Sequence, residues 1–244
     1  MNVLVVGATS AIAEEAARLW AARGDAVYLA ARRESLLASI ADDLRLRGAR
    51  QVGFEPFDVS ARDTHERLLT SAENAIGALD CLLVAHGTLP DQAACFADPE
   101  LAVREIDLNA VATAALVLRA AARFEARGAG AIAVVTSVAG VRGRQSNFVY
   151  GAAKGMVSRL LEGLRHRLHG RGVAVVDIRP GFVDTPMTAS FRKGALWASP
   201  ARVAKDIVKA VDRRAGVVYT PWFWRWIMMV IRHLPDFIFL RTRL

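Results

Sequence analysis

Three residues in the second half of the chain have the types and the spacing of a proton-transfer site. Tyr150 and Lys154 stand four residues apart in "SNFVYGAAKGM", so on a helix they share one face. A lysine ammonium near a phenol favours the phenolate and eases proton donation to a carbonyl oxygen that receives a hydride. Ser137 precedes Tyr150 by thirteen residues, and its hydroxyl can hydrogen-bond the same oxygen. The trio therefore predicts acid catalysis at a carbonyl group.

A fourth polar residue, Asn109, lies in "DLNAVATAA", where an asparagine inside a helix is locally unfavourable. One interpretation is that it anchors a proton-relay water near Lys154. The other is an ordinary buried amide that bonds the backbone.

These residues must be held by a regular framework, and the apolar pattern predicts one. Continuously apolar runs alternate with amphipathic stretches of helical length, which is typical of parallel strands buried on both faces. The expected strands are 2–7, 26–31, 51–57, 79–87, 131–137, 173–181 and 216–220, and the expected helices are 11–23, 34–47, 61–76, 99–127, 147–169 and one begun by Ser199 and Pro200. We predict a single-domain α/β fold, a Rossmann-type doubly wound parallel sheet of about seven strands, with a C-terminal hydrophobic helical extension. We expect residues 1–220 to form the domain that binds NADP and contains the catalytic site, and residues 221–244 to form the tail.

The first loop, "VVGATSAIAEE", is typical of a phosphate cradle. Gly7 supplies the tight turn, Thr9 and Ser10 offer hydroxyls, and the helix that follows presents its positive end. Ala11 and Ala13 stand where the pattern GxxxGxG has glycine, and alanine resists a positive φ. A plain strand-to-helix turn is the alternative.

The end of the second strand indicates which dinucleotide would bind. An acidic residue there holds a ribose 2′-hydroxyl, whereas arginine suits a 2′-phosphate. The stretch "YLAARRES" has Arg32 and Arg33 and no acid before them. We expect NADP(H), the alternative being two solvated arginines.

Composition excludes several classes of protein. The net charge is +8, but the arginines are dispersed and no nucleic-acid motif is visible, so we expect no nucleic-acid partner. Two cysteines, Cys81 and Cys95, lack metal-like spacing and indicate a reducing compartment. No basic leader precedes the first apolar run, and we expect a cytoplasmic protein.

Together these motifs resemble the short-chain dehydrogenase/reductase family over essentially the whole chain. The family's nucleotide loop corresponds to Gly7–Ala13, including Ile12, and its "NNAG" stretch to "VAHG", which keeps Gly87 and has Ala85 in place of an asparagine. The other stretches that match the family are its adenine-contacting Asp58 and Val59, its tetrad Asn109, Ser137, Tyr150 and Lys154, and its nicotinamide-binding Pro180, Gly181, Val183 and Thr185.

The resemblance implies that Tyr150 donates the proton, Ser137 orients the oxygen, Lys154 binds the nicotinamide ribose and Asn109 continues the proton path. It also implies a homo-oligomer. "GRQSNFVYGAAKG" and the tail further resemble the decaprenylphosphoryl-2-keto-erythro-pentofuranose reductase group, which serves cell-envelope biosynthesis, reduces a polyprenyl-phosphate-linked keto sugar and works with a flavin-dependent oxidase. The alternatives are a general carbonyl or 3-oxoacyl reductase, and an NADP-binding regulatory subunit without catalysis.

The tail, "YTPWFWRWIMMVIRHLPDFIFLRTRL", is too short and too charged between Pro221 and Pro235 to span a membrane comfortably. Its clustered tryptophans and basic residues favour attachment to the surface of an anionic membrane, on the inner face of the cell membrane. A protein–protein interface and a place in the chain's own core are the alternatives.

Two arginines, Arg142 and Arg144, lie between Ser137 and Tyr150. One interpretation is that one of them contacts a substrate phosphate, and the alternative is that both are solvated.

Overall fold

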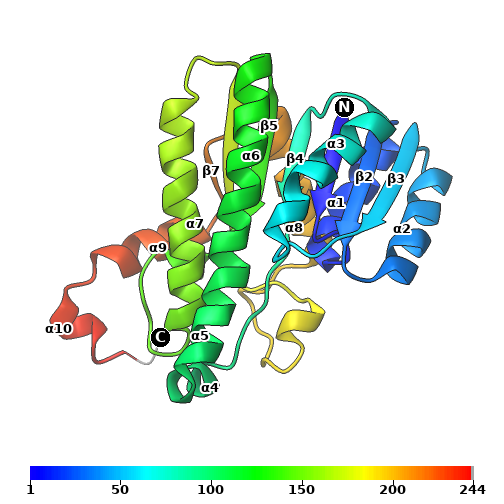
Figure 1. The fold of residues 1–244 in the computed structure, drawn as a ribbon. Coiled ribbons are helices and arrows are strands. Elements are labelled where there is room, and N and C mark those ends of the chain that lie inside the picture. The colour runs from blue at the N-terminus through cyan, green and yellow to red at the C-terminus, as the bar shows by residue number, and fades with distance from the viewer. Residues whose placement is uncertain (243–244) are drawn as a thin grey trace.

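The computed structural model describes residues 1–242 and contains a sheet of seven parallel strands between two layers of helices (Figure 1). The spatial order is β3-β2-β1-β4-β5-β6-β7, so the chain reverses direction across the sheet between β1 and β4. The strands are β1 (Asn2–Val6), β2 (Ala26–Ala31), β3 (Gln51–Pro56), β4 (Cys81–Val84), β5 (Gly130–Val135), β6 (Val173–Pro180) and β7 (Val217–Thr220). The predicted doubly wound α/β fold is confirmed.

Helices cover both faces of the sheet, which explains why its strands are apolar without alternation. Val3 and Val5 of β1 pack into the core on one face, and Leu4 and Val6 pack into the core on the other. The first core includes α1 (Ala11–Ala22), α2 (Glu34–Leu46) and α8 (Pro200–Asp212), and the second includes α3 (His65–Ile76), α6 (Ala112–Arg127) and α7 (Phe148–Arg167).

The single helix predicted over 99–127 is interrupted. Helix α5 (Pro99–Ile106) passes into one π-helical turn, Asp107–Val111, before α6 begins. The turn contains Asn109, and such turns often occur at functional sites. The apolar spacing could not reveal it because the chain remains helical on both sides. A short helix, α4 (Gln92–Ala97), was also not predicted; Asp91 caps it by accepting a hydrogen bond from Ala94 N.

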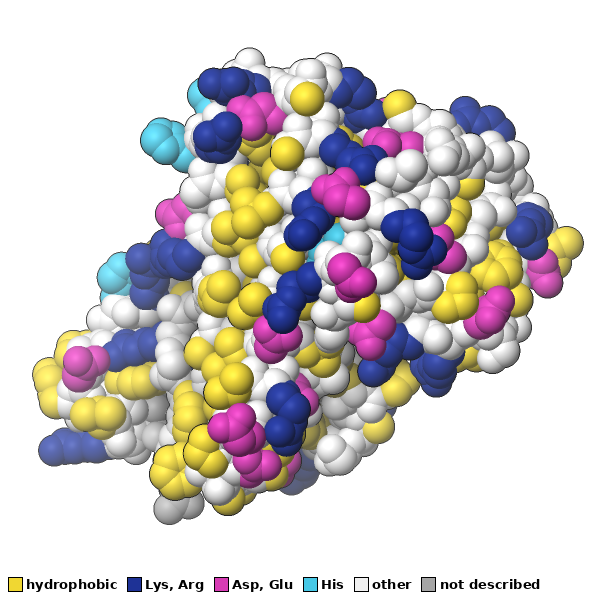
Figure 2. All heavy atoms as spheres, viewed as in Figure 1, with side chains coloured by type: hydrophobic (Ala, Val, Ile, Leu, Met, Phe, Trp, Pro, Cys, Tyr) yellow, Lys and Arg dark blue, Asp and Glu magenta, His cyan; other side chains and the backbone are white. Residues whose placement is uncertain are grey.

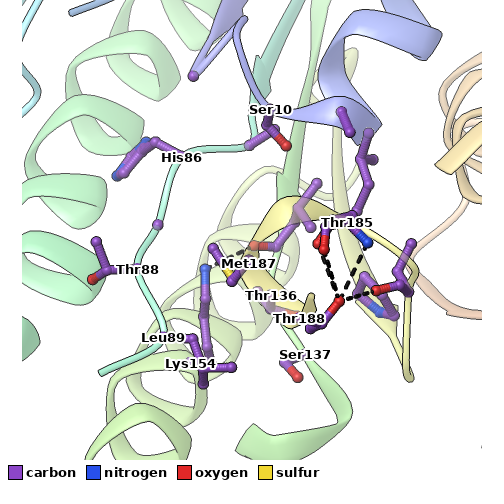
Figure 3. A pocket seen from close by; sticks show the side chains of 18 of the residues that line it. Ser10, His86, Thr88, Leu89, Thr136, Ser137, Lys154, Thr185, Met187 and Thr188 are labelled. Carbon is purple, nitrogen blue, oxygen red and sulfur yellow. Dashed lines mark hydrogen bonds between the residues drawn. The ribbon is translucent and has the colours of Figure 1, made fainter. Parts of the chain in front are cut away.

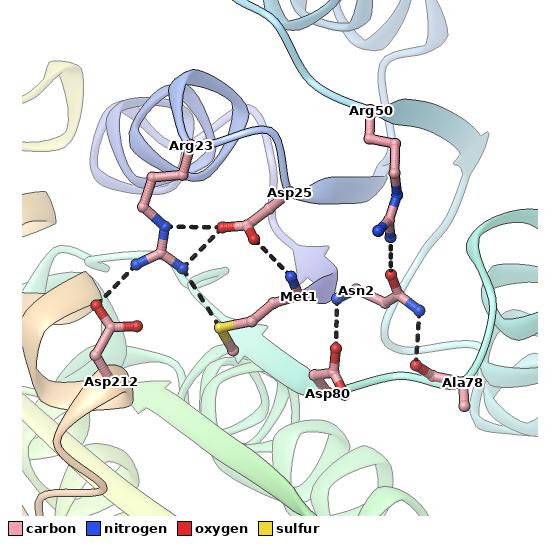
Figure 4. A network of polar contacts seen from close by, with 8 residues as sticks. All are labelled: Met1, Asn2, Arg23, Asp25, Arg50, Ala78, Asp80 and Asp212. Atoms are coloured by element: carbon pink, nitrogen blue, oxygen red, sulfur yellow. Dashed lines mark hydrogen bonds and ion pairs between the residues drawn. The ribbon is translucent and has the colours of Figure 1, made fainter.

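At the amino ends of the strands a polar network ties the start of the chain to the body (Figure 4). The Met1 ammonium lies 2.5 Å from Asp25 Oδ1, and Arg23 bridges Asp25 to Asp212 of α8. Asn2 N donates to Asp80 Oδ2 at the start of β4. These contacts hold the edge of the sheet opposite to the site, and their role is structural.

The tail forms α9 (Trp224–His233) and α10 (Asp236–Phe239), an arm that extends beside the lower part of α7 (Figure 1). Its last two residues, 243–244, lie outside the described residues. Trp224, Met228 and Ile231 are buried in a small core with Val138, so one face of α9 belongs to the domain. None of the described helices has the length and apolar character that crossing a membrane requires.

Two contacts fix this arm to the loops around the predicted site. A Cβ on Gly181 would lie 1.9 Å from Trp224 Nε1, so the indole rests directly on the glycine backbone. The Arg142 guanidinium donates to the carbonyl oxygens of Ile231 (2.7 Å) and Leu234 (2.6 Å) and pairs with Asp236. The arm therefore packs behind the loops that line the site, although none of the described tail residues lines the cavity itself.

Two tryptophans of the tail differ strongly in their exposed fraction, and this difference predicts how each contributes to the stability of the fold. Trp224 is 4% exposed and Trp222 is 65% exposed. Replacing a fully packed aromatic ring by alanine leaves a cavity, so Trp224→Ala should lower the free energy of unfolding by about 3–5 kcal/mol. Denaturant titration followed by circular dichroism measures it.

The matched control is Trp222→Ala, which should change the same free energy by no more than about 0.5 kcal/mol. Equal effects of the two substitutions would show that α9 does not pack as described.

Candidate active site

A cavity of about 700 Å³ opens at the carboxyl ends of the strands. This edge, at the reversal in strand order, is where open α/β sheets bind their ligands. Every predicted catalytic and cofactor-binding residue except Asn109 lines it. These predicted lining residues are Gly7, Thr9, Ser10, Ile12, Arg32, Arg33, Asp58, Val59, Ala85, Gly87, Ser137, Tyr150, Lys154, Pro180, Gly181, Val183 and Thr185.

The first loop has the geometry of a phosphate cradle in spite of its alanines. Gly7 has a φ of 79°, and a Cβ there would lie 2.4 Å from His86 N, so glycine is required on both counts. Ala11 and Ala13 lie inside α1, where a negative φ is normal, and their Cβ atoms cause no strain. The Ser10 side chain makes no capping bond, which leaves the first N–H groups of α1 available to an anion.

Arg32 and Arg33 lie in the loop after β2, at the cavity end that an adenine ribose would occupy. Both side chains are exposed, and within residues 1–242 neither forms an ion pair. Asp58, after β3, is turned toward its own loop, where its carboxylate accepts a hydrogen bond from Ser60 N at 2.9 Å. The two guanidinium groups thus remain available for a phosphate.

Ser137, Tyr150 and Lys154 meet at the other end of the cavity. Ser137 is the N-cap of the 3₁₀ turn Val138–Gly140, and its Oγ accepts from Ala139 N at 3.1 Å, so its own proton can be donated to a ligand. Burial raises the pKa of Tyr150 to about 12, and an interaction with Ser137 partly offsets the rise. The phenol is therefore protonated at neutral pH, as a proton donor must be.

Lys154 shares one face of α7 with Tyr150, as the four-residue spacing predicts, but no hydrogen bond to the phenol oxygen is present among the described residues. Its Nζ donates to Val135 O at 3.1 Å and lies 5.8 Å from the centre of the Tyr150 ring. Burial lowers the pKa of Lys154 to about 8, and the nearby Asp177 acts in the opposite direction. An ammonium has three donors, so two remain for a ligand such as a ribose.

Gly87 allows the backbone after β4 to approach two of the predicted residues. A Cβ on Gly87 would lie 2.9 Å from Asn109 Oδ1 and 3.3 Å from Lys154 Nζ. Asn109 Oδ1 accepts from Thr88 N at 3.0 Å, and its Nδ2 donates to Thr88 Oγ1 and Glu105 O. Asn109 is thus an engaged buried amide that fixes the 87–88 turn beside Lys154.

Several lining residues were not predicted. Figure 3 shows His86, Thr88 and Leu89 along one side of the cavity, and Met187 and Thr188 along the other, beside the predicted Thr185. The remaining unpredicted residues that matter below are Asn147, Phe182 and Phe191. Their sequence carries little signal because they come from loops, where no periodicity marks the inward-facing side. His86 alone had a signal, since "VAHG" departs from its family pattern there.

His86 is neutral at physiological pH. Burial lowers its pKa to about 3, and the charge of Lys154 acts in the same direction. Its Nε2 lies 2.9 Å from Thr113 Oγ1. A neutral, fixed imidazole is consistent with a structural role at the base of the cavity.

The comparisons with known proteins agree with this geometry. The family model described as short chain dehydrogenase matches residues 1–195. An uncharacterized oxidoreductase of Mycobacterium tuberculosis is 36% identical over 239 residues, covering 98% of this chain and 96% of the relative. An uncharacterized oxidoreductase of Streptomyces coelicolor is 35% identical over 241 residues, covering 98% and 95%.

Solved structures show the same fold. A short chain dehydrogenase/reductase family protein superposes with a TM-score of 0.78 at 27% identity, covering 89% of this chain and 94% of its own. An actinorhodin polyketide ketoreductase variant with NADPH superposes with a TM-score of 0.82, covering 91% and 96%; at 23% identity it supports the fold alone.

The fold and the cavity define an NAD(P)-dependent oxidoreductase. The chain belongs to the short-chain dehydrogenase/reductase family.

The lowered pKa of Lys154 predicts how activity varies with pH. The group carries its charge below its pKa and loses it above, so catalysis that needs the ammonium should fall as pH rises through about 8. The measurement is a profile of kcat/KM for ketone reduction between pH 6 and about 11, where a single lost proton gives a tenfold fall per pH unit.

Lys205→Gln, which removes an exposed lysine from α8, should leave the profile unchanged. A fall that begins only near 10.5, the ordinary lysine value, would contradict the description of Lys154 as buried and charged.

Proposed function

We propose that this chain is an NADP(H)-dependent reductase that converts a ketone to a secondary alcohol on a lipid-linked keto sugar, a sugar carried on a polyprenyl phosphate. The observation that carries the proposal is the arrangement of one cavity: Ser137, Tyr150 and Lys154 meet at one end, and Arg32 and Arg33 lie at the other.

Each of the four site residues has a distinct role in the proposed reaction. The bound dinucleotide supplies the hydride. Tyr150 donates its proton to the substrate oxygen, which the Ser137 hydroxyl orients from the adjacent turn. Lys154 holds the nicotinamide ribose with its two remaining donors, and its charge favours the phenolate that Tyr150 becomes. Asn109 acts by positioning the Thr88 turn and sits on the proton path behind Lys154.

Two observations favour NADP(H) over NAD(H). Strand β2 ends on Ala31, so no carboxylate is present to hold a ribose 2′-hydroxyl, and the two arginines that follow suit a 2′-phosphate. The similar ketoreductase structure contains NADPH.

The substrate end of the cavity is largely apolar, and this favours a substrate with an apolar, lipid-like part. Leu89, Phe182, Met187 and Phe191 line it. Phe182 stacks on Trp197 with ring centres 5.4 Å apart and meets Trp224 of the tail edge-on at 5.3 Å. A general carbonyl or 3-oxoacyl reductase is the second candidate, favoured by the likeness to a polyketide ketoreductase. The complete trio disfavours a non-catalytic subunit.

The outer face of the tail supports attachment to a membrane surface. Trp222, Trp226, Met229 and Val230 are exposed, and the basic Arg225 and Arg232 lie among them. Tryptophan beside arginine favours the interface of an anionic bilayer. We place the enzyme on the cytoplasmic side, where a flavin-dependent oxidase partner would deliver the keto sugar.

A second apolar surface supports a homo-oligomer. Exposed hydrophobic side chains follow α5 to α7, and Figure 2 shows a band of them down this face. They include Val103, Val111, Leu118, Phe148 and Met156. Contiguous exposed apolar surface of this kind is typical of an interface between subunits.

The direct test is Tyr150→Phe, which removes the proton donor and keeps the ring. Turnover of a ketone should fall by about 10²- to 10⁴-fold, because the substrate oxygen loses its general acid. NADPH oxidation at 340 nm measures turnover, and fluorescence titration should show NADPH binding retained.

The same assay with NADH should give a lower kcat/KM, and turnover should be greater with a membrane-lipid extract than with soluble ketones. Full activity in Tyr150→Phe would reject the catalytic assignment. A preference for NADH would reject the cofactor assignment and leave the reductase class intact.

The membrane proposal predicts the behaviour of a double variant, Trp226→Ser with Val230→Ser, on the outer face of α9. Binding to vesicles rich in phosphatidylglycerol should weaken by at least about tenfold, because apolar area would no longer enter the interface. Co-sedimentation measures it. Leu46→Ser, which removes a still more exposed apolar side chain on α2, is the control and should bind as the unaltered chain does. Unchanged binding of the double variant would reject the attachment.

A further inference from the structure

We infer that Arg144 and Asn147 form a subsite for a phosphoryl group and a neighbouring hydroxyl group of the substrate, at the catalytic end of the cavity. The inference rests on the proposed reductase function and deepens it, because it names chemistry that the substrate must carry.

The two residues are placed together by one turn. The segment 141–147 joins the 3₁₀ turn after Ser137 to helix α7, which begins at Phe148 and contains Tyr150. Asn147 is the N-cap of α7, and its N donates to Arg144 O at 3.2 Å. Both side chains line the cavity that contains Tyr150 and Ser137.

Each of them presents a buried polar atom without a partner. Arg144 Nε is a donor and Asn147 Oδ1 is an acceptor, and neither has a hydrogen bond to any described residue. Buried polar groups in folded proteins are nearly always satisfied, so unsatisfied ones in residues that line a cavity indicate a ligand. The pair calls for an acceptor, such as a phosphoryl oxygen, and a donor, such as a sugar hydroxyl.

The charge around this subsite favours an anion. Burial lowers the pKa of Arg144, and no carboxylate acts against it. Asp58 is the one acidic residue among those lining the cavity, and it lies at the nucleotide end. The N-terminus of the 20-residue α7 adds partial positive charge, with no acid in its first turn.

A comparison with the neighbouring Arg142 shows why Arg144 is the residue expected to bind the anion. Arg142 is fully engaged with the tail, where it bonds two carbonyl oxygens, pairs with Asp236 and lies 3.8 Å over the ring of Phe239. Of the two arginines that the sequence left as alternatives, only Arg144 has a guanidinium free for a ligand. A guanidinium fork suits phosphoryl oxygens.

The phosphates of a bound dinucleotide have other partners, which is why this anion belongs to the substrate. The N-terminus of α1 and the two arginines after β2 serve them, and these elements line the opposite end of the cavity. A phosphoryl group beside the reacting carbonyl, with an apolar wall beyond it, fits a keto sugar joined through phosphate to a lipid.

The test uses two soluble ketones that differ only in a phosphoryl group next to the carbonyl, dihydroxyacetone phosphate and dihydroxyacetone. The full chain should show a higher kcat/KM for the phosphorylated probe, and Arg144→Gln should reduce that preference by about 10- to 100-fold, as expected for lost charge-assisted hydrogen bonds. Arg144→Lys should restore part of it, because the charge returns without the fork.

Arg192→Gln is the matched control, since it removes an equal charge from an exposed position next to the lining residue Phe191. It should leave the preference unchanged. Asn147→Leu, which keeps the approximate shape of the side chain, should lower kcat/KM for both probes by a similar factor, because both carry a hydroxyl group. A preference that survives Arg144→Gln overturns the inference while the reductase function stands.

A binding measurement separates the inference from the proposed function. Calorimetric titration of dihydroxyacetone phosphate into the enzyme–NADP⁺ complex should detect binding that Arg144→Gln weakens, even if neither probe is reduced. Binding without turnover supports the subsite and counts against reduction of such ketones. No binding to the unaltered chain, or an effect of Arg144→Gln on NADPH affinity alone, overturns the subsite.

Discussion

The end of the cavity that contains Ser137 and Tyr150 depends on how the buried ammonium group of Lys154 is compensated. A charge taken out of water must be compensated, and here Val135 O and the field of Asp177 do this. Both come from the central strands β5 and β6, so the position of the lysine is set by the sheet itself. Asp177 in turn bonds Thr136 and Arg179, which connects the charge to the residue before Ser137.

Close backbone approach is the second constraint. Gly87 lets the end of β4 reach Asn109 and Lys154, and Gly7 lets the first loop lie against His86. The π-helical turn at Asn109 belongs to the same arrangement, because it brings a side chain from a long helix against the 87–88 turn. Small side chains at these points allow three segments, distant in sequence, to share one cavity.

The tail also makes a close contact of this kind, with loops near Ser137 and Tyr150. Trp224 rests on Gly181 in the loop after β6, and Arg142 fastens the arm to the segment that contains Arg144. One face of α9 therefore packs against loops that line the cavity, while the other is exposed. The three interpretations of the tail drawn from the sequence are thus compatible, since an amphipathic helix can contribute to the core and still present an apolar face outward.

The sequence by itself determined the parallel doubly wound fold and the residues that line the cavity from β-strand ends, because strand burial and tight turns leave local patterns. Ala11 and Ala13 looked like departures from a motif, and only their helical backbone showed that they cause no strain. The tertiary structure alone decided that Lys154 bonds Val135 O, that Arg142 holds the tail, and that Arg144 faces the cavity unpaired. Those outcomes depend on contacts between segments far apart in the chain, which neither periodicity nor spacing encodes.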